Sequence, residues 1–194
     1  MDEKETLHTY LRRSRDELLS KLDGLSEYDA HRPMTATGTS LLGLVKHVAS
    51  VGLGYFGETF GRRADRLLPW FEDGAEADGD MWATADESIA DIVDLHRYAA
   101  AHADATIDAL PLDAPGVVQW WPPERRDVTL HHILVRMCVE TARHAGHADI
   151  LRELIDGRAG MGPNDGNLPD RSAEEWAAFR ARIEEAAQAA GRRA

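Results

Sequence analysis

The stretch Glu140-Thr-Ala-Arg-His144-Ala-Gly-His147 lies inside an apolar helical pattern and decides how the whole chain is interpreted. At about 100° per residue, Glu140 and His144 lie roughly 40° apart on a helix, and His147 lies about 20° to the other side of Glu140. Ile133 and Leu151 project in nearly the same direction. Burying a carboxylate is costly unless a partner neutralises it, and a divalent cation is one such partner. The pattern therefore predicts a helix whose core-facing side carries polar residues that could bind a metal ion.

Helical periodicity also dominates the rest of the chain. Gly24 and Gly157 mark the ends of the first and fourth helices, and Thr84-Ala-Asp-Glu87 and Ser172-Ala-Glu-Glu175 have the pattern of capping boxes. The short apolar segment 117–121 is expected to be an ordered loop over one end of the molecule, or a weakly paired strand. The expected helices are about 3–22, 40–60, 84–110 and 129–155, followed by a last helix that opens at residue 172.

These elements predict an all-α fold, a four-helix bundle with an additional C-terminal helix and long connecting loops. We expect a single domain, 1–194, with its core at about 3–157 and a C-terminal loop and helix at 158–194. The long connections leave room for a topology other than simple up-down-up-down.

Composition excludes several classes of function. The chain has 34 acidic and 22 basic residues, for a formal net charge of -12, so neither nucleic acid nor an anionic membrane is expected as a partner. The single cysteine, Cys138, excludes an internal disulfide framework and fits a reducing compartment. We see no signal peptide and no apolar run of about 18 residues, and therefore expect a cytoplasmic protein.

The candidate metal site combines two helices. The spacing of Glu140 and His144 places two ligands on consecutive turns, and His47, on the apolar side of the second helix, is available as a third. The alternatives are an ion pair of Glu140 with Arg136 or Arg143 and a core role for His144.

Several other polar and aromatic residues have weaker interpretations. Surface positions are expected for His8, His31, His96 and His102, and capping or solvent-exposed positions for His131 and His132. Trp120 and Trp121 either wall a pocket or, as we favour, plug one end of the bundle. The glycines of the second helix allow either close packing or space for a ligand. Cys138 is expected to be a buried, inert thiol on the far side of its helix.

Three segments resemble the DinB-like superfamily, and specifically its actinobacterial branch of mycothiol-dependent S-transferases and proteins like the maleylpyruvate isomerase N-terminal region. They are Arg32-Pro-Met-Thr with Gly38-Thr-Ser-Leu-Leu-Gly-Leu-Val-Lys-His47-Val, then Thr129-Leu-His-His-Ile-Leu-Val-Arg-Met, then residues 140–157. The resemblance implies a four-helix bundle with a divalent metal held by His47, Glu140 and His144. Many members carry histidine where this chain has Glu140, and the carboxylate is similar to the mycothiol-dependent maleylpyruvate isomerase type.

Two functions follow as expectations. The first is a thiol-dependent S-transferase or isomerase that activates mycothiol, or another small thiol, for reaction with an electrophilic substrate. The metal would be zinc first, with nickel, iron or manganese as alternatives. His147 would complete the site by ligation, by orienting a ligand, or by catalytic proton transfer. The alternative function is a non-catalytic, metal-stabilised bundle for interaction, sensing or dimerisation. Homodimerisation is left open, and a nuclease role fits poorly with an acidic chain.

Overall fold

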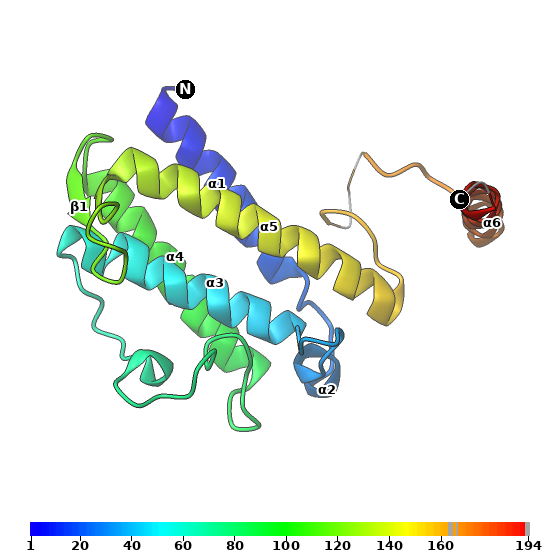
Figure 1. Cartoon of the computed structure of the whole chain (residues 1–194), viewed down its shortest axis with the longest axis horizontal. Helices are drawn as coiled ribbons and strands as arrows, with labels where there is room; N and C mark the ends of the chain where they lie inside the picture. Colours follow the sequence, from blue (N-terminus) through cyan, green and yellow to red (C-terminus); the bar gives the residue numbers. More distant parts are fainter. Residues whose placement is uncertain (163–164, 166, 193–194) are drawn as a thin grey trace. The chain divides into compact units, whose positions relative to one another are not determined.

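The computed structural model describes residues 1–162, 165 and 167–192, in two compact units that divide after Gly162. The first unit is the predicted four-helix bundle, and all four long helices are confirmed (Figure 1). They are α1 (Glu3–Ser20), α3 (Leu41–Phe56), α4 (Ile89–Ala109) and α5 (Leu130–Asp156). None of the helices in the described ranges is long and apolar enough to cross a membrane.

Short elements connect these helices and were not all expected. A five-residue helix and two 3-10 turns lie before and after α3, and two short antiparallel strands precede α5. The segment 117–121 thus contributes one residue to a strand and is otherwise a loop, as favoured from the sequence. The bounds are α2 (Glu27–His31), η1 (Glu58–Phe60), η2 (Pro69–Phe71), β1 (Pro115–Val117) and β2 (Asp127–Thr129).

The predicted start of the third helix at residue 84 is wrong. A capping box does open α4, but it is formed by Ser88 and Asp91. Glu87 accepts hydrogen bonds from the backbone amide of Thr84 and from Lys46, so it closes a turn before the helix and links that turn to α3. The second helix also ends earlier than expected, at Phe56, because Gly57 leaves the helical conformation.

Contacts between the helices define their directions. Lys21 pairs with Asp149 and His131 pairs with Glu3, so α1 and α5 run parallel. Lys46 pairs with Glu87, which precedes α4, and Arg62, which follows α3, reaches Thr106 near the end of α4. Helices α3 and α4 are therefore also parallel, and the bundle is not a simple up-down-up-down arrangement.

This topology determines the course of the long connection between α3 and α4. Because two parallel neighbours must be joined by a crossover that returns along their length, residues 57–88 run back beside α3. Trp70 Nε1 donates to Ser50 Oγ at 3.1 Å, and Lys46 Nζ donates to the Trp82 carbonyl at 2.9 Å. The crossover is thus fastened to α3 at both ends of its return path.

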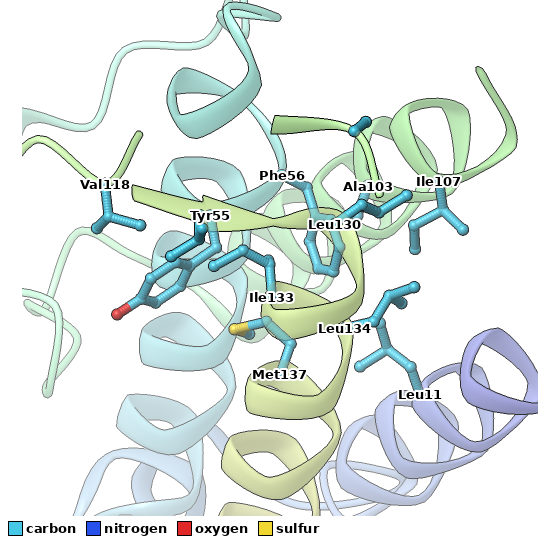
Figure 2. Packing of buried hydrophobic residues seen from close by; sticks show 12 residues of the cluster. Leu11, Tyr55, Phe56, Ala103, Ile107, Val118, Leu130, Ile133, Leu134 and Met137 are labelled. Atoms are coloured by element: carbon cyan, nitrogen blue, oxygen red, sulfur yellow. The ribbon is translucent and has the colours of Figure 1, made fainter. Parts of the chain in front are cut away.

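Side chains from all four long helices form the core. Figure 2 shows the cluster in which Leu11 of α1, Phe56 of α3, Ile107 of α4 and Leu134 of α5 meet. A second cluster, centred on Leu18, Leu42 and Val45, continues the core toward the other end of the bundle, and a third lies between α3 and α4.

The second unit contains one helix, α6 (Ala173–Gly191). Its start is the predicted capping box: Ser172 accepts from the Glu175 amide, and the Glu175 carboxylate accepts from the Ser172 amide. No residue of α6 is buried. That 1–194 form one domain stays a prediction.

The core makes a direct prediction about stability. Leu134 is fully buried, whereas Leu154 on the same helix is 65% exposed. Leu134→Ala should lower the free energy of unfolding by about 2–5 kcal/mol, because it removes buried methyl groups and leaves a cavity. Leu154→Ala should change it by about 0.5 kcal/mol or less. Urea denaturation followed by circular dichroism measures both, and equal losses in the two variants would contradict this account of the core.

Candidate metal centre

The structure brings His47, Glu140 and His144 together from two helices. Glu140 Oε1 lies 3.3 Å from His47 Nε2 and 3.1 Å from His144 Nε2. One ligand atom from each residue lies within 4.8 Å of the other two. Neither Arg136 nor Arg143, the alternative partners considered for Glu140, forms an ion pair with it in the part of the chain that is described. That the three residues hold a metal remains a prediction.

Asp80 orients His47 and is the residue that sequence reasoning missed. Its Oδ2 lies 2.6 Å from His47 Nδ1, and its side chain is only 12% exposed. It comes from the crossover, in an acidic run that also contains Glu72, Asp73 and Glu76. Nothing in that run distinguishes one carboxylate from another, and the signal for Asp80 exists only in the folded structure.

Glycine at position 43 permits this contact. A Cβ atom on Gly43 would overlap the backbone carbonyl of Met81, the residue after Asp80. Gly43 lies one turn before His47 on α3, so the crossover backbone touches the helix beside the metal centre. Close packing, one of the two reasons considered for the glycines of this helix, explains this one.

Protonation follows from the hydrogen bonds. Burial favours neutral carboxyl groups, but the contacts with the imidazoles outweigh it and lower the pKa of both Asp80 and Glu140. Burial also disfavours a charged His47, yet the hydrogen bonds and charges of Asp80 and Glu140 raise the pKa of His47. Two ionised carboxylates on opposite ring nitrogens require a proton on each nitrogen. A cation at Nε2 would therefore replace a proton there.

His144 completes the cluster. Its ring centroid lies 4.9 Å from that of His47, in an edge-to-face arrangement, and its side chain is 12% exposed. Burial and the charge of His47 lower the pKa of His144. Its Nδ1 is buried and has no hydrogen-bond partner among the described residues.

These observations fit a divalent metal. Two imidazole nitrogens and one carboxylate oxygen are a donor set used by zinc and related ions, and catalytic zinc sites have three protein ligands. The contact from Asp80 to His47 Nδ1 is the carboxylate–histidine pairing that fixes a ligating imidazole. The residues present therefore suit the ion that the sequence led us to expect.

His147 lies next to the cluster but outside it. Its ring centroid is 5.5 Å from that of His144, and the residue is exposed. It is not one of the three residues whose ligand atoms converge. Of the roles considered for it, orientation or proton transfer agrees better with this placement than ligation.

A cavity of about 610 Å³ adjoins the site, and Asp80 and Val51 belong to its wall. Its other walls include Tyr55, Trp120 and apolar residues of the crossover such as Leu68 and Phe71. A Cβ on Gly54 would lie 3.1 Å from the Trp120 ring, so this glycine leaves room for the indole against α3. Trp120 lines this cavity, as in the first of the two roles considered for it.

Two histidines expected at the surface are buried. His8 is 7% exposed, and its Nε2 hydrogen-bonds Asp104, a partner on another helix that also binds Arg15. His96 is 4% exposed, and burial together with the charges of Arg15 and Arg97 lowers its pKa to about 4. Neither lies in the metal-type cluster. The half-buried Cys138 donates to the Leu7 carbonyl, and burial raises the pKa of its thiol, in agreement with an inert cysteine.

Asp80 provides the test of the site geometry. Asp80→Asn removes the charge that fixes His47, and the affinity for Zn²⁺ should fall about 10–100-fold, as is typical for the loss of such a carboxylate. Asp73→Asn, a change at an exposed carboxylate of the same crossover, is the matched control and should bind normally. Competition with a chromogenic chelator measures both affinities, and equal affinities would show that Asp80 does not position a ligand.

Comparison with known proteins agrees with the architecture. The crystal structure of a conserved protein from Enterococcus faecalis superposes with a TM-score of 0.56 at 18% identity, covering 81% of this chain and 99% of that one, which shows a shared fold. The comparison with curated proteins gives no match. The family model described as mycothiol S-transferase matches residues 6–157, which include the whole cluster and Asp80. The chain therefore belongs to the mycothiol S-transferase family of DinB-like proteins.

Proposed function

We propose that this protein is a mycothiol-dependent S-transferase or isomerase that uses a divalent metal held by His47, Glu140 and His144. Family membership supports the thiol and the reaction class. The observation that carries the proposal is the convergence of three ligand-type atoms from α3 and α5 beside a cavity large enough for a small substrate. Zinc is the first expectation, with nickel, iron or manganese as alternatives.

A divalent ion bound there would supply Lewis acidity, which lowers the pKa of a thiol and favours its nucleophilic form. The protein's own residues do the rest. Asp80 holds the His47 ring in one orientation, and the carboxylate of Glu140 balances positive charge between two imidazoles. The cavity walled by Tyr55 and Trp120 would hold the electrophile next to the site.

The transfer itself is a substitution or an addition at an electrophilic carbon. In a substitution the sulfur forms a bond to carbon, the leaving group departs with its electron pair, and the thiol proton is released. We assign His147 to the movement of this proton or to the orientation of the thiol, because it is the exposed imidazole beside the cluster.

The alternative is a metal that only stabilises the bundle. Such a site would have a closed shell of protein ligands, whereas the described cluster offers three and adjoins an open cavity. We therefore favour the enzymatic function. The two functions can be distinguished by replacing one of the side chains proposed to bind the metal.

Glu140→Gln should lower Zn²⁺ affinity at least about tenfold and abolish mycothiol transfer to a nitroaromatic chloride, because an amide cannot balance the metal charge. The matched control is Glu153→Gln, at an exposed position on the same helix. Elemental analysis after dialysis and a spectrophotometric conjugation assay measure the two effects. Full metal content in Glu140→Gln would refute the ligand assignment. If the wild type never transfers the thiol, but its thermal stability falls when the metal is removed, the stabilising role is favoured.

His147 has a separate prediction. His147→Gln should reduce the transfer rate about 10²-fold or more, in the range typical of proton-transfer groups, while metal content stays at the wild-type level. The comparison of metal content with the pH profile of kcat/KM separates this role from ligation. If His147→Gln loses the metal, His147 is a ligand. If transfer is unchanged, the residue has no part in the reaction.

A further inference from the structure

The exposed Arg136 packs against two aromatic side chains. Its guanidinium carbon lies 5.0 Å from the ring centroid of Tyr55 and 4.9 Å from that of Trp121, so the group is in contact with two aromatic rings. The rings themselves are fixed, since Trp121 Nε1 donates to the Tyr55 hydroxyl at 3.2 Å. Tyr55 is 5% exposed and belongs to the core cluster of Figure 2. The arginine is therefore positioned by rigid neighbours.

Among the described residues, none accepts a hydrogen bond from the Arg136 guanidinium. A guanidinium stacked on rings keeps its N–H donors in the plane, where they match the two oxygens of a carboxylate. No carboxylate of the described ranges forms an ion pair with Arg136. The buried arginines Arg15 and Arg152, by contrast, have acidic partners.

Arg136 lines a groove. A hollow of about 550 Å³ is lined by Trp121, Arg125, Asp127, His132 and Arg136. Two of these side chains are cationic and one is anionic, and the His132 ring lies 5.7 Å from that of Trp121. The groove therefore combines aromatic surface with net positive charge, the two features that bind an aromatic or unsaturated carboxylate.

The groove is next to the metal centre. Residues 132, 136, 140 and 144 follow one another at i, i+4 spacing on α5, so Arg136 precedes Glu140 by one turn, or about 6 Å along the helix axis. Across from them on α3, Tyr55 lies two turns after His47. Tyr55 also lines the cavity beside Asp80, where its ring is 5.2 Å from that of Trp120. Tyr55 therefore contacts Arg136 of the groove and also lines the cavity.

We propose that Arg136, stacked on Tyr55 and Trp121, binds the carboxylate of an anionic substrate, so that the electrophile accepted by this protein is an unsaturated or aromatic carboxylic acid. The identification of this ligand as the electrophile rests on the proposed function; the carboxylate site itself does not. In an acidic protein, which repels anions, a local cation is needed to hold such a substrate close to the reacting sulfur.

The binding test uses 4-chloro-3-nitrobenzoate and its neutral analogue 4-chloro-3-nitrobenzamide, without any thiol. Dissociation constants for the metal-loaded full-length protein come from titration calorimetry. The wild type should bind the benzoate at least tenfold more tightly than the benzamide. Arg136→Gln should lose this preference, and Arg136→Lys, which keeps the charge but not the planar fork, should retain only part of it.

Arg143→Gln, an exposed arginine on the same helix, is the matched control and should keep the wild-type preference. Circular dichroism verifies that each variant is folded. A wild type without preference for the benzoate would overturn the proposal, and so would an Arg136→Gln variant that keeps it. The second result would mean that the carboxylate binds elsewhere, for example at the metal.

The transfer assay separates this proposal from the proposed function. With mycothiol present, the sulfur forms a bond to the ring carbon, chloride leaves with its electron pair, and the thiol proton is released. An Arg136-dependent preference in binding with no transfer would support the carboxylate site and contradict the transferase. Transfer to both substrates without dependence on Arg136 would support the transferase and overturn the carboxylate site.

Discussion

The structure around the site depends on one constraint: a carboxylate on the core side of α5 must be balanced by groups that α5 alone does not supply. Glu140 satisfies it with two imidazoles, one from its own helix and one from α3. The second of these is in turn held by Asp80. The hydrogen bonds that link Asp80, His47 and Glu140 thus join three segments that are far apart in sequence. Ionised acids and a protonated imidazole stabilise each other here, and the same atoms form a nitrogen and oxygen donor set for a cation.

The topology explains why Asp80 can take part. Two parallel neighbours, α3 and α4, need a crossover that returns along the bundle. That return brings residues 69–82 beside α3, where Trp70 and Lys46 fasten it. The crossover therefore supplies both the carboxylate that orients His47 and much of the wall of the adjoining cavity. The helices fix the ligands, and the connections determine what can approach them.

The sequence was informative where a property depends on local spacing. The four long helices and the juxtaposition of His47 with the α5 pair follow from apolar periodicity, helped by the resemblance to a family. Prediction from the sequence failed where two possible helix starts lie close together, or where a residue's position depends on a contact with a residue far away in the sequence. Residues 84–87 have the pattern of a capping box, but Glu87 is held in a turn by its contact with Lys46, and Ser88 and Asp91 start the helix instead. The buried position of His8 depends on Asp104, 96 residues away. Asp80 could not be told from the other acids of its run, because its role arises only when the crossover folds back.

Gly43 shows how far such a site extends beyond its donor atoms. Where the crossover passes α3, the two main chains are in direct contact, with no side chain between them. Any side chain larger than the hydrogen atom of Gly43 would push the crossover away from the helix. The spacing Gly-x-x-x-His is therefore as much a part of the signature of this centre as Glu-x-x-x-His. Relatives that keep the ligands but carry a larger residue at the glycine would have to route the crossover differently, and would hold their imidazole by other means.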